Sequence, residues 1–161
     1  ITRRLDLGAG WTARVHAERI ALQSHDEPTP LPSAHIVTEV APDRARRILA
    51  RWPTLAGRRF VVADADTVGP LRVGRAGAGR RLVPHGMSGS RLLRDLLAEA
   101  GVPEDARAAW PVVETERGDV LWLAGIRASA EAHLRVDSTR ATLLYTGAPS
   151  FWAPPPLRLD P

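Results

Sequence analysis

The chain of 161 residues is long enough for one ordinary domain or two small ones, and its 44% hydrophobic content is compatible with a sizeable core. It contains no cysteine, which excludes disulfide bonds and thiolate metal sites, and it has no apolar run of membrane-spanning length. All 22 cationic side chains are arginine, yet 18 acidic residues reduce the formal net charge to +4. This charge does not by itself require a nucleic-acid partner, so the local distribution of arginine matters more.

Residues 1–68 read as a β-rich unit with one short helix. Apolar residues alternate on both sides of residues 8–10, which predicts a hairpin with a glycine turn. Three further strands are predicted, over residues 19–23, 35–40 and 59–63. Three prolines predict an exposed loop over residues 24–34. Pro42, followed by an acidic residue, predicts a helix over residues 42–51.

Residues 69–147 read as a second small unit, and residues 148–161 as a proline-rich tail. Strands are predicted over residues 71–73, 111–114, 120–124, 134–136 and 141–145. A short helix is predicted over residues 103–109. The chain is therefore expected to be an α+β protein of mostly antiparallel strands, with two to three short helices, in two small units.

The longest helix of the second unit is expected to begin at a cap formed by Ser88 or Ser90 and to end at Gly101. Its apolar stripe comprises Leu92, Leu93, Leu96, Leu97 and Ala100. This pattern predicts that one side of the helix packs on the core and that the other side faces solvent.

Arginine is concentrated between residues 72 and 94, at about twice its average frequency in the chain. The candidate nucleic-acid-binding residues are Arg72, Arg75, Arg80, Arg81, Arg91, Arg94 and Arg127. Planar guanidinium groups and the backbone amides of a glycine loop are both suited to phosphate oxygens. Arg91 and Arg94 are three positions apart and would share one face of the expected helix. A salt bridge from Arg91 to Asp95 would instead make it an ordinary surface ion pair.

Residues 74–81 are similar to a phosphate-binding Walker loop without matching it. Gly74 and Gly79 have the right separation, but Arg80 replaces the lysine and Arg81 replaces the Ser or Thr that binds magnesium. Pro84 would also block the helix that should follow. We therefore reject a nucleoside triphosphate site. Two interpretations remain open: a basic loop that contacts a backbone phosphate, or a solvated loop.

No residue pattern indicates a catalytic or metal site. Asp64 and Asp66 are best explained by a turn at the end of a strand, and the five histidines lack metal-ligand spacing. His85, beside the basic loop, is expected to be a turn residue. Three residues in apolar sequence are expected in the core, namely Met87, Trp110 and Trp122.

An ordered set of motifs runs from Leu71 to Arg127. It comprises Leu71-Arg-Val73, Gly79 with Arg81, Pro84 with Gly86-Met87, the segment 91–95, Val102-Pro103, Pro111-Val-Val113, and Leu121-Trp122 with Gly125 and Arg127. This set resembles the C-terminal region of bacterial tRNA(Ile)-lysidine synthetases, and a weaker similarity extends back to about Leu5. The chain departs from the family pattern at Gly74, Arg80 and Leu92, where arginine, aspartate and lysine are usual.

The resemblance implies the tRNA-recognising portion of an ATP-dependent ligase that joins lysine to a wobble cytidine. The family's catalytic signature, Ser-Gly-Gly-x-Asp-Ser, is absent from these residues. No catalytic residue, metal or cofactor is therefore expected here, whereas ATP and magnesium are implied for the full-length enzyme. The resemblance also implies contact with the tRNA acceptor stem, a cytoplasmic location and no membrane partner.

Two alternatives stay open at this point. The chain could be a non-catalytic protein-interaction or dimerisation module, including a homodimer, in which the arginines reflect biased composition. A self-contained enzyme is disfavoured because no catalytic constellation is visible. The chain begins at Ile1 rather than methionine. We therefore expect a fragment or a processed chain, which leaves room for a catalytic domain upstream.

Overall fold

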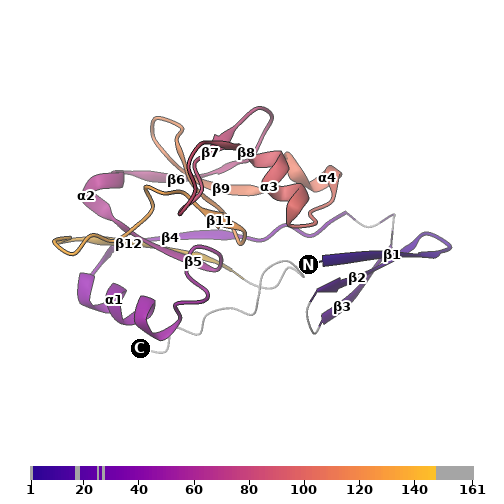
Figure 1. The fold of residues 1–161 in the computed structure, drawn as a ribbon, viewed down its shortest axis with the longest axis horizontal. Coiled ribbons are helices and arrows are strands. Elements are labelled where there is room, and N and C mark those ends of the chain that lie inside the picture. The colour runs from indigo at the N-terminus through magenta and orange to yellow at the C-terminus, as the bar shows by residue number, and fades with distance from the viewer. Residues whose placement is uncertain (1, 17–18, 25, 27, 148–161) are drawn as a thin grey trace.

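A computed structural model describes residues 2–16, 19–24, 26 and 28–147 (Figure 1). In chain order its elements are β1 (Thr2–Gly8), β2 (Trp11–His16), β3 (Arg19–Ser24), β4 (Ala34–Val40), α1 (Pro42–Arg51), β5 (Phe60–Asp64), α2 (Ala65–Val68), β6 (Leu71–Arg75), β7 (Arg81–Leu82), β8 (Arg91–Leu92), α3 (Leu93–Glu99), α4 (Glu104–Arg107), β9 (Pro111–Thr115), β10 (Val120–Leu123), β11 (Arg127–Ala128) and β12 (Ala141–Thr146). The strand pairs of its sheets are antiparallel, which confirms the predicted α+β class. Within these residues, no helix is long and apolar enough to cross a membrane.

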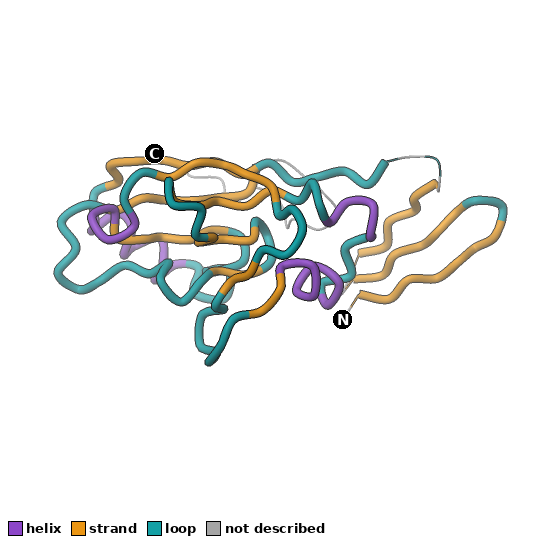
Figure 2. The backbone as a smooth tube through the Cα atoms, turned by 90° about the horizontal axis from the view of Figure 1, so that it is seen from above, coloured by secondary structure: helices purple, strands orange, loops and turns teal. Residues whose placement is uncertain are grey.

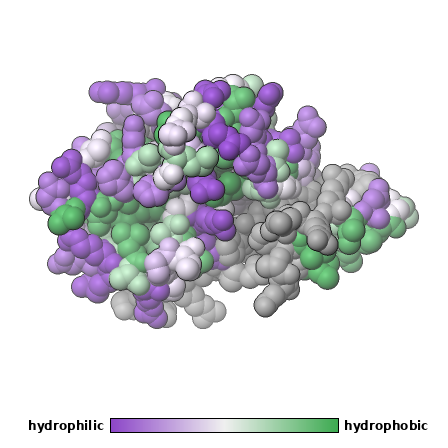
Figure 3. All heavy atoms as spheres, viewed as in Figure 1, coloured by the Kyte–Doolittle hydropathy of each residue, from purple (hydrophilic) through white to green (hydrophobic). Residues whose placement is uncertain are grey.

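The first three strands form a separate antiparallel sheet, β1-β2-β3, that extends away from the rest of the molecule (Figures 1 and 2). Residues 8–10 all have positive φ angles, so the predicted glycine turn is confirmed. Strand register places Leu5 opposite Ala13, and Ala13 opposite Leu22, so apolar side chains gather on one face. Several large side chains on this sheet are exposed, namely Leu5, Leu7, Trp11, Ile20 and Leu22. The end of the molecule formed by this sheet shows a green area at the right of Figure 3.

The second sheet joins distant parts of the chain in the order β4-β12-β5. Tyr145 in β12 lies opposite His35 in β4 on one side and Phe60 in β5 on the other. Helix α1 covers one face of this sheet, where Ala45 and Ile48 are buried in a cluster with strand residues. The helix occupies residues 42–51, as its proline and first-turn acid predict.

A third sheet, in the order β11-β10-β9-β6, packs on the other face of the second one. Their shared core includes Val61 and Leu144 from one sheet, and Val113 and Trp122 from the other. The expected division of the chain at residues 68 and 69 therefore runs through one core and one sheet. The reason is that strand order in a sheet depends on tertiary pairing, and β12 lies between two strands from the first half of the chain.

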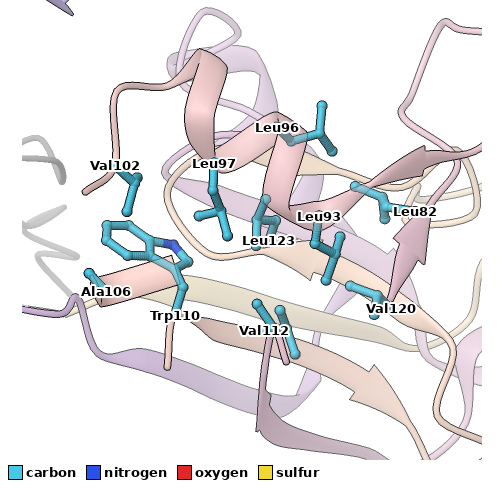
Figure 4. Close-up of a cluster of buried hydrophobic side chains, with 11 residues drawn as sticks. Leu82, Leu93, Leu96, Leu97, Val102, Ala106, Trp110, Val112, Val120 and Leu123 are labelled. Atoms are coloured by element: carbon cyan, nitrogen blue, oxygen red, sulfur yellow. The ribbon is translucent and has the colours of Figure 1, made fainter. Parts of the chain in front are cut away.

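Helices α3 and α4 complete the layers by covering the outer face of the third sheet (Figure 4). Leu93, Leu96 and Leu97 of α3 are buried there with Trp110 and strand residues. The indole Nε1 of Trp110 donates a hydrogen bond of 2.9 Å to the carbonyl of Ala124, so its polar atom is satisfied inside the core. Apart from the β1-β2-β3 sheet, the molecule (its body) is therefore layered in the order helix, sheet, sheet, helix.

Several local predictions were wrong. Helix α3 begins at Leu93, because Arg91 and Leu92 pair with β7 as a short strand instead of continuing a helix from Ser88 or Ser90. Residues 134–136 form no strand, and the turn after Asp64 contains the additional one-turn helix α2. Trp110 and Trp122 are fully buried as predicted, but Met87 is 44% exposed in the loop after β7.

Candidate nucleic-acid interface

The predicted basic loop lies between β6 and β7 and is held by a buried acid, Glu114. The side chain of Glu114 is 7% exposed and projects from β9, next to β6. Its Oε1 accepts a hydrogen bond of 2.8 Å from Arg72 Nε, and its Oε2 forms an ion pair with Arg80 Nη2. The same Arg80 nitrogen donates to the carbonyl of Gly118, and Arg80 Nη1 donates to the carbonyl of Arg75. The Arg80 guanidinium therefore ties both ends of the loop to the sheet.

Gly74 provides the space that this carboxylate occupies. A Cβ atom at Gly74 would lie 2.9 Å from Glu114 Cδ and 3.0 Å from each carboxylate oxygen. Two of the departures from the family pattern, Gly74 and Arg80, therefore meet at one point in the structure. A side chain at position 74 and the observed placement of Glu114 exclude each other.

The charge of Glu114 follows from its surroundings. Burial alone raises the pKa of a carboxyl group, but hydrogen bonds and charge from Arg80 and Arg72 outweigh that effect and leave the Glu114 pKa below its usual value. Glu114 is therefore an anion at neutral pH. It neutralises part of the positive charge of Arg72 and Arg80.

The hairpin β7-β8 brings a second arginine next to the start of α3. Arg81 Nε donates a hydrogen bond of 2.8 Å to the Ser90 hydroxyl, and Arg81 Nη2 donates to the Ser90 carbonyl at 2.9 Å. Ser90 thus orients an exposed arginine instead of capping a helix. The amide of Leu93 donates to the carbonyl of Arg80 at 2.9 Å, which fixes the start of α3 beside the basic loop.

The remaining candidate arginines differ in how far they are available to a ligand. Arg91 lies on β8 and pairs with Glu99 rather than with Asp95. Arg94 is 72% exposed and makes only a 3.4 Å contact with Asp95. Arg75 is exposed at the end of β6. Arg91 and Arg94 do not share a helix face, because only Arg94 belongs to α3.

Arg127 lies apart from Arg72 and Arg75, on β11 at the opposite edge of the same sheet. It is half-buried beside the loop of residues 83–90, whose His85 amide donates to the carbonyl of Ala128 at 3.0 Å. His85 occupies a turn, as predicted, and both Val83 and Met87 are exposed on the same loop. The structure thus places one predicted arginine away from the β6 edge.

Asp64 has a structural role at the start of α2. Its carboxylate accepts hydrogen bonds from the amides of Asp66 and Thr67 and from the hydroxyl of Ser138, so it caps α2. The Ser138 hydrogen bond, followed by the Thr67 amide, lowers the pKa of Asp64. Among the described residues, no group of three or more His, Cys, Asp or Glu side chains could hold a metal ion.

The important residue that the sequence analysis missed is Glu114. It sits at the end of an apolar strand, where a charged side chain is rarely buried unless it has a partner, and that position was the available signal. Together, these features define an α+β domain whose exposed arginines surround a rigidly held glycine loop. Such a surface is suited to a polyanionic ligand.

Residues 71–144 match the family model for the TilS substrate C-terminal domain. Over this segment, the chain is similar to the C-terminal domains of tRNA(Ile)-lysidine synthases. The matched segment includes the basic loop, the β7-β8 hairpin, α3 and Glu114. Strands β1 to β5 and helix α1 lie outside it.

Longer proteins of known type show the same similarity. A tRNA(Ile)-lysidine synthase of Geobacillus kaustophilus is 38% identical over 87 residues, which cover 53% of this chain and 19% of that protein. One from Bacillus cereus strain ATCC 10987 is 38% identical over 73 residues, covering 45% of this chain and 15% of the relative. The chain therefore spans less than one fifth of the length of either enzyme.

Two solved structures share the fold. A crystal structure of a TilS C-terminal domain aligns with a TM-score of 0.55 and 24% identity, covering 91% of this chain and 90% of that one. An N-terminal fragment of the phenylalanyl-tRNA synthetase β-subunit from Pyrococcus horikoshii aligns with a TM-score of 0.50 and 17% identity, over 78% of this chain and 41% of the fragment. At these identities, both likenesses concern the fold alone.

Proposed function

We propose that this chain is the tRNA-binding portion of a tRNA(Ile)-lysidine synthetase. The observation that carries the proposal is the loop between β6 and β7, which Arg80 and Glu114 hold rigid while Arg75, Arg81 and Arg94 remain exposed around it. This arrangement lies inside the segment that matches the family model.

The physical chemistry of folded RNA favours this role. The stem of a tRNA is an A-form helix, and proteins contact it mainly through phosphates and 2′-hydroxyl groups. Guanidinium groups on a fixed loop can donate paired hydrogen bonds to phosphate oxygens without a large loss of conformational entropy. In our proposal Arg75, Arg81 and Arg94 contact RNA directly, while Arg72 and Arg80 support the loop. Arg91 and Arg127 are peripheral.

The complete enzyme would contain more than this chain. We propose that a separate catalytic domain binds ATP and magnesium and joins lysine to the wobble cytidine, while this portion engages the acceptor stem. A cytoplasmic location belongs to the same proposal. The isolated chain would then bind tRNA and form no lysidine.

A salt titration tests the proposal. If about four phosphates are neutralised, raising the salt concentration from about 50 to about 200 mM should weaken tRNA binding about a hundredfold. The double variant Arg75→Gln/Arg94→Gln should bind more weakly and lower the slope of log affinity against log salt by about two. Filter binding or fluorescence anisotropy measures both quantities.

A charge-matched double variant provides the control. Arg135 pairs with Asp137, and Arg140 pairs with Glu39 and Asp66, all outside the loop. Arg135→Gln/Arg140→Gln removes the same charge and should leave most of the slope in place. A flat salt response of the unaltered chain would contradict the proposal and favour an interaction or dimerisation module, for which the exposed apolar face of β1-β2-β3 is the supporting observation.

A further inference from the structure

Helix α1 carries a second row of arginines that belongs to neither the basic loop nor the segment matched by the family model. Arg44, Arg47 and Arg51 follow one another at intervals of three and four residues, so they lie along one side of the helix. All three are exposed, whereas Ala45 and Ile48 are buried against the sheet. With about 1.5 Å of rise per residue, the row extends about 10 Å along the helix axis.

The acid of this helix is already paired. Asp43 accepts a hydrogen bond of 3.0 Å from Arg46 Nη1, and Arg46 Nη2 donates to the carbonyl of Val136 at 2.7 Å. Arg46 therefore has a structural role, and the other three guanidinium groups of α1 are not neutralised by an acid of the same helix. The guanidinium carbon of Arg51 lies 4.9 Å from the centre of the Trp52 ring, a contact that limits where this side chain points.

Helix stability does not explain Arg44. It lies in the first turn of α1, where the positive end of the helix dipole disfavours a cation. The helix dipole therefore interacts unfavourably with Arg44, whereas it interacts favourably with Arg51 in the last turn. The position of Arg44 is therefore better explained by a ligand than by the stability of the helix itself.

The row lies on the opposite side of the molecule from the basic loop. Helix α1 covers the outer face of the β4-β12-β5 sheet, and the third sheet separates that layer from α3 (Figure 1). The surface over α1 is largely hydrophilic in Figure 3. A ligand bound flat against the loop and α3 does not extend onto α1 without passing around the body.

We propose that the Arg44, Arg47 and Arg51 row of α1 is a second contact site for the phosphate backbone of RNA. The inference rests on the proposed tRNA-binding function and adds a separate segment of contacted RNA. A row of guanidinium groups is suited to successive phosphates of one strand. The exposed positions of α1 are Asp43, Arg44, Arg47, Ala50 and Arg51. They include no large apolar side chain of the kind that anchors protein partners, which favours RNA over an acidic protein.

The test compares three double variants of the whole chain, each lacking two positive charges. They are Arg44→Gln/Arg47→Gln on α1, Arg75→Gln/Arg94→Gln on the loop side, and Arg135→Gln/Arg140→Gln as the control. Binding to tRNA is measured across salt concentrations, and the protected nucleotides are mapped by hydroxyl-radical footprinting. Melting temperatures show whether each variant is folded.

The α1 variant should lower the salt slope by about two and bind several-fold to a hundredfold more weakly at about 100 mM salt. It should no longer protect one RNA segment that the loop variant still protects. Its melting temperature should equal or exceed that of the unaltered chain, because Arg44 opposes the helix dipole. If the α1 variant shows the same salt slope and the same footprint as the control variant, this inference is wrong, while the proposed role of the loop is unaffected. If the unaltered chain shows no salt-dependent binding to tRNA, that result would instead contradict the proposed function.

Discussion

Glu114 contacts three residues that lie 34 to 42 positions before it in the sequence. Arg72 and Arg80 bind its two carboxylate oxygens, and Gly74 leaves the space in which the carboxylate lies. A buried charge is costly unless it is paired, so these residues are expected to act as one unit. Changing any one of them should affect the position of the basic loop.

Glu114→Gln should lower the free energy of unfolding by about 1–3 kcal/mol near neutral pH, because it replaces charge-assisted hydrogen bonds with weaker ones. The folded-state pKa of Glu114 lies below its usual value, so this stabilisation is present above the usual value and is lost as pH falls through the lowered one. The stability difference between the variant and the unaltered chain should therefore narrow with acidification. Urea denaturation between about pH 7 and about pH 3 measures it.

Glu116→Gln is the matched control, since Glu116 is exposed in the turn between β9 and β10. It should change stability by less than about 0.5 kcal/mol at every pH. Gly74→Ala should disturb the same ion pairs, because the added Cβ displaces the Glu114 carboxylate. Its stability difference from the unaltered chain should therefore also narrow as the pH falls. If the loss of unfolding free energy caused by Glu114→Gln is the same at every pH, the ion pairs of Glu114 do not stabilise the fold.

At the scale of elements, α3 shows how packing determines where a helix begins. Leu92 occupies its N-cap position without a side-chain cap, while Ser90 is engaged by Arg81. The helix is seven residues long, which is too short to be stable through local propensity. Its stability must come from Leu93, Leu96 and Leu97, which are buried in the cluster of Figure 4.

Leu96→Ala should therefore cost about 2–5 kcal/mol of stability, because Leu96 is 4% exposed and its removal leaves a cavity. Leu22→Ala makes the same chemical change in β3 at a side chain that is 63% exposed, and should cost less than about 1 kcal/mol. Thermal or urea denaturation of both variants tests the difference. Equal costs would mean that α3 does not pack on the third sheet as described.

At the scale of the whole molecule, β12 holds the body together. It forms the centre of the second sheet, between β4 and β5, and Leu144 contributes to the core shared with the third sheet. By contrast, the three buried clusters found among the described residues contain no residue of β1, β2 or β3. The main structural division therefore follows β3, within the proline-rich segment.

Two truncations test this division. A chain of residues 28–161 lacks β1 to β3 and should melt cooperatively within a few degrees of the unaltered chain. A chain of residues 69–161 lacks β4 and β5 and should fail to fold, because β12 would lose both neighbouring strands. Circular dichroism during heating distinguishes the two. Cooperative melting of residues 69–161 would instead support the predicted division at residue 68.

Local sequence patterns predicted much of this protein. Alternating apolar residues, a glycine turn and Pro42 predicted the first hairpin, most strands and α1, because neighbouring residues determine those elements. The ordered motifs between residues 71 and 127 also indicated the family that the segment 71–144 matches. Only tertiary structure decided the position of β12, the true start of α3 and the roles of Arg80 and Glu114. Each depends on residues 30 or more positions apart or on competition between strand pairing and helix formation, which single-sequence periodicity does not reveal.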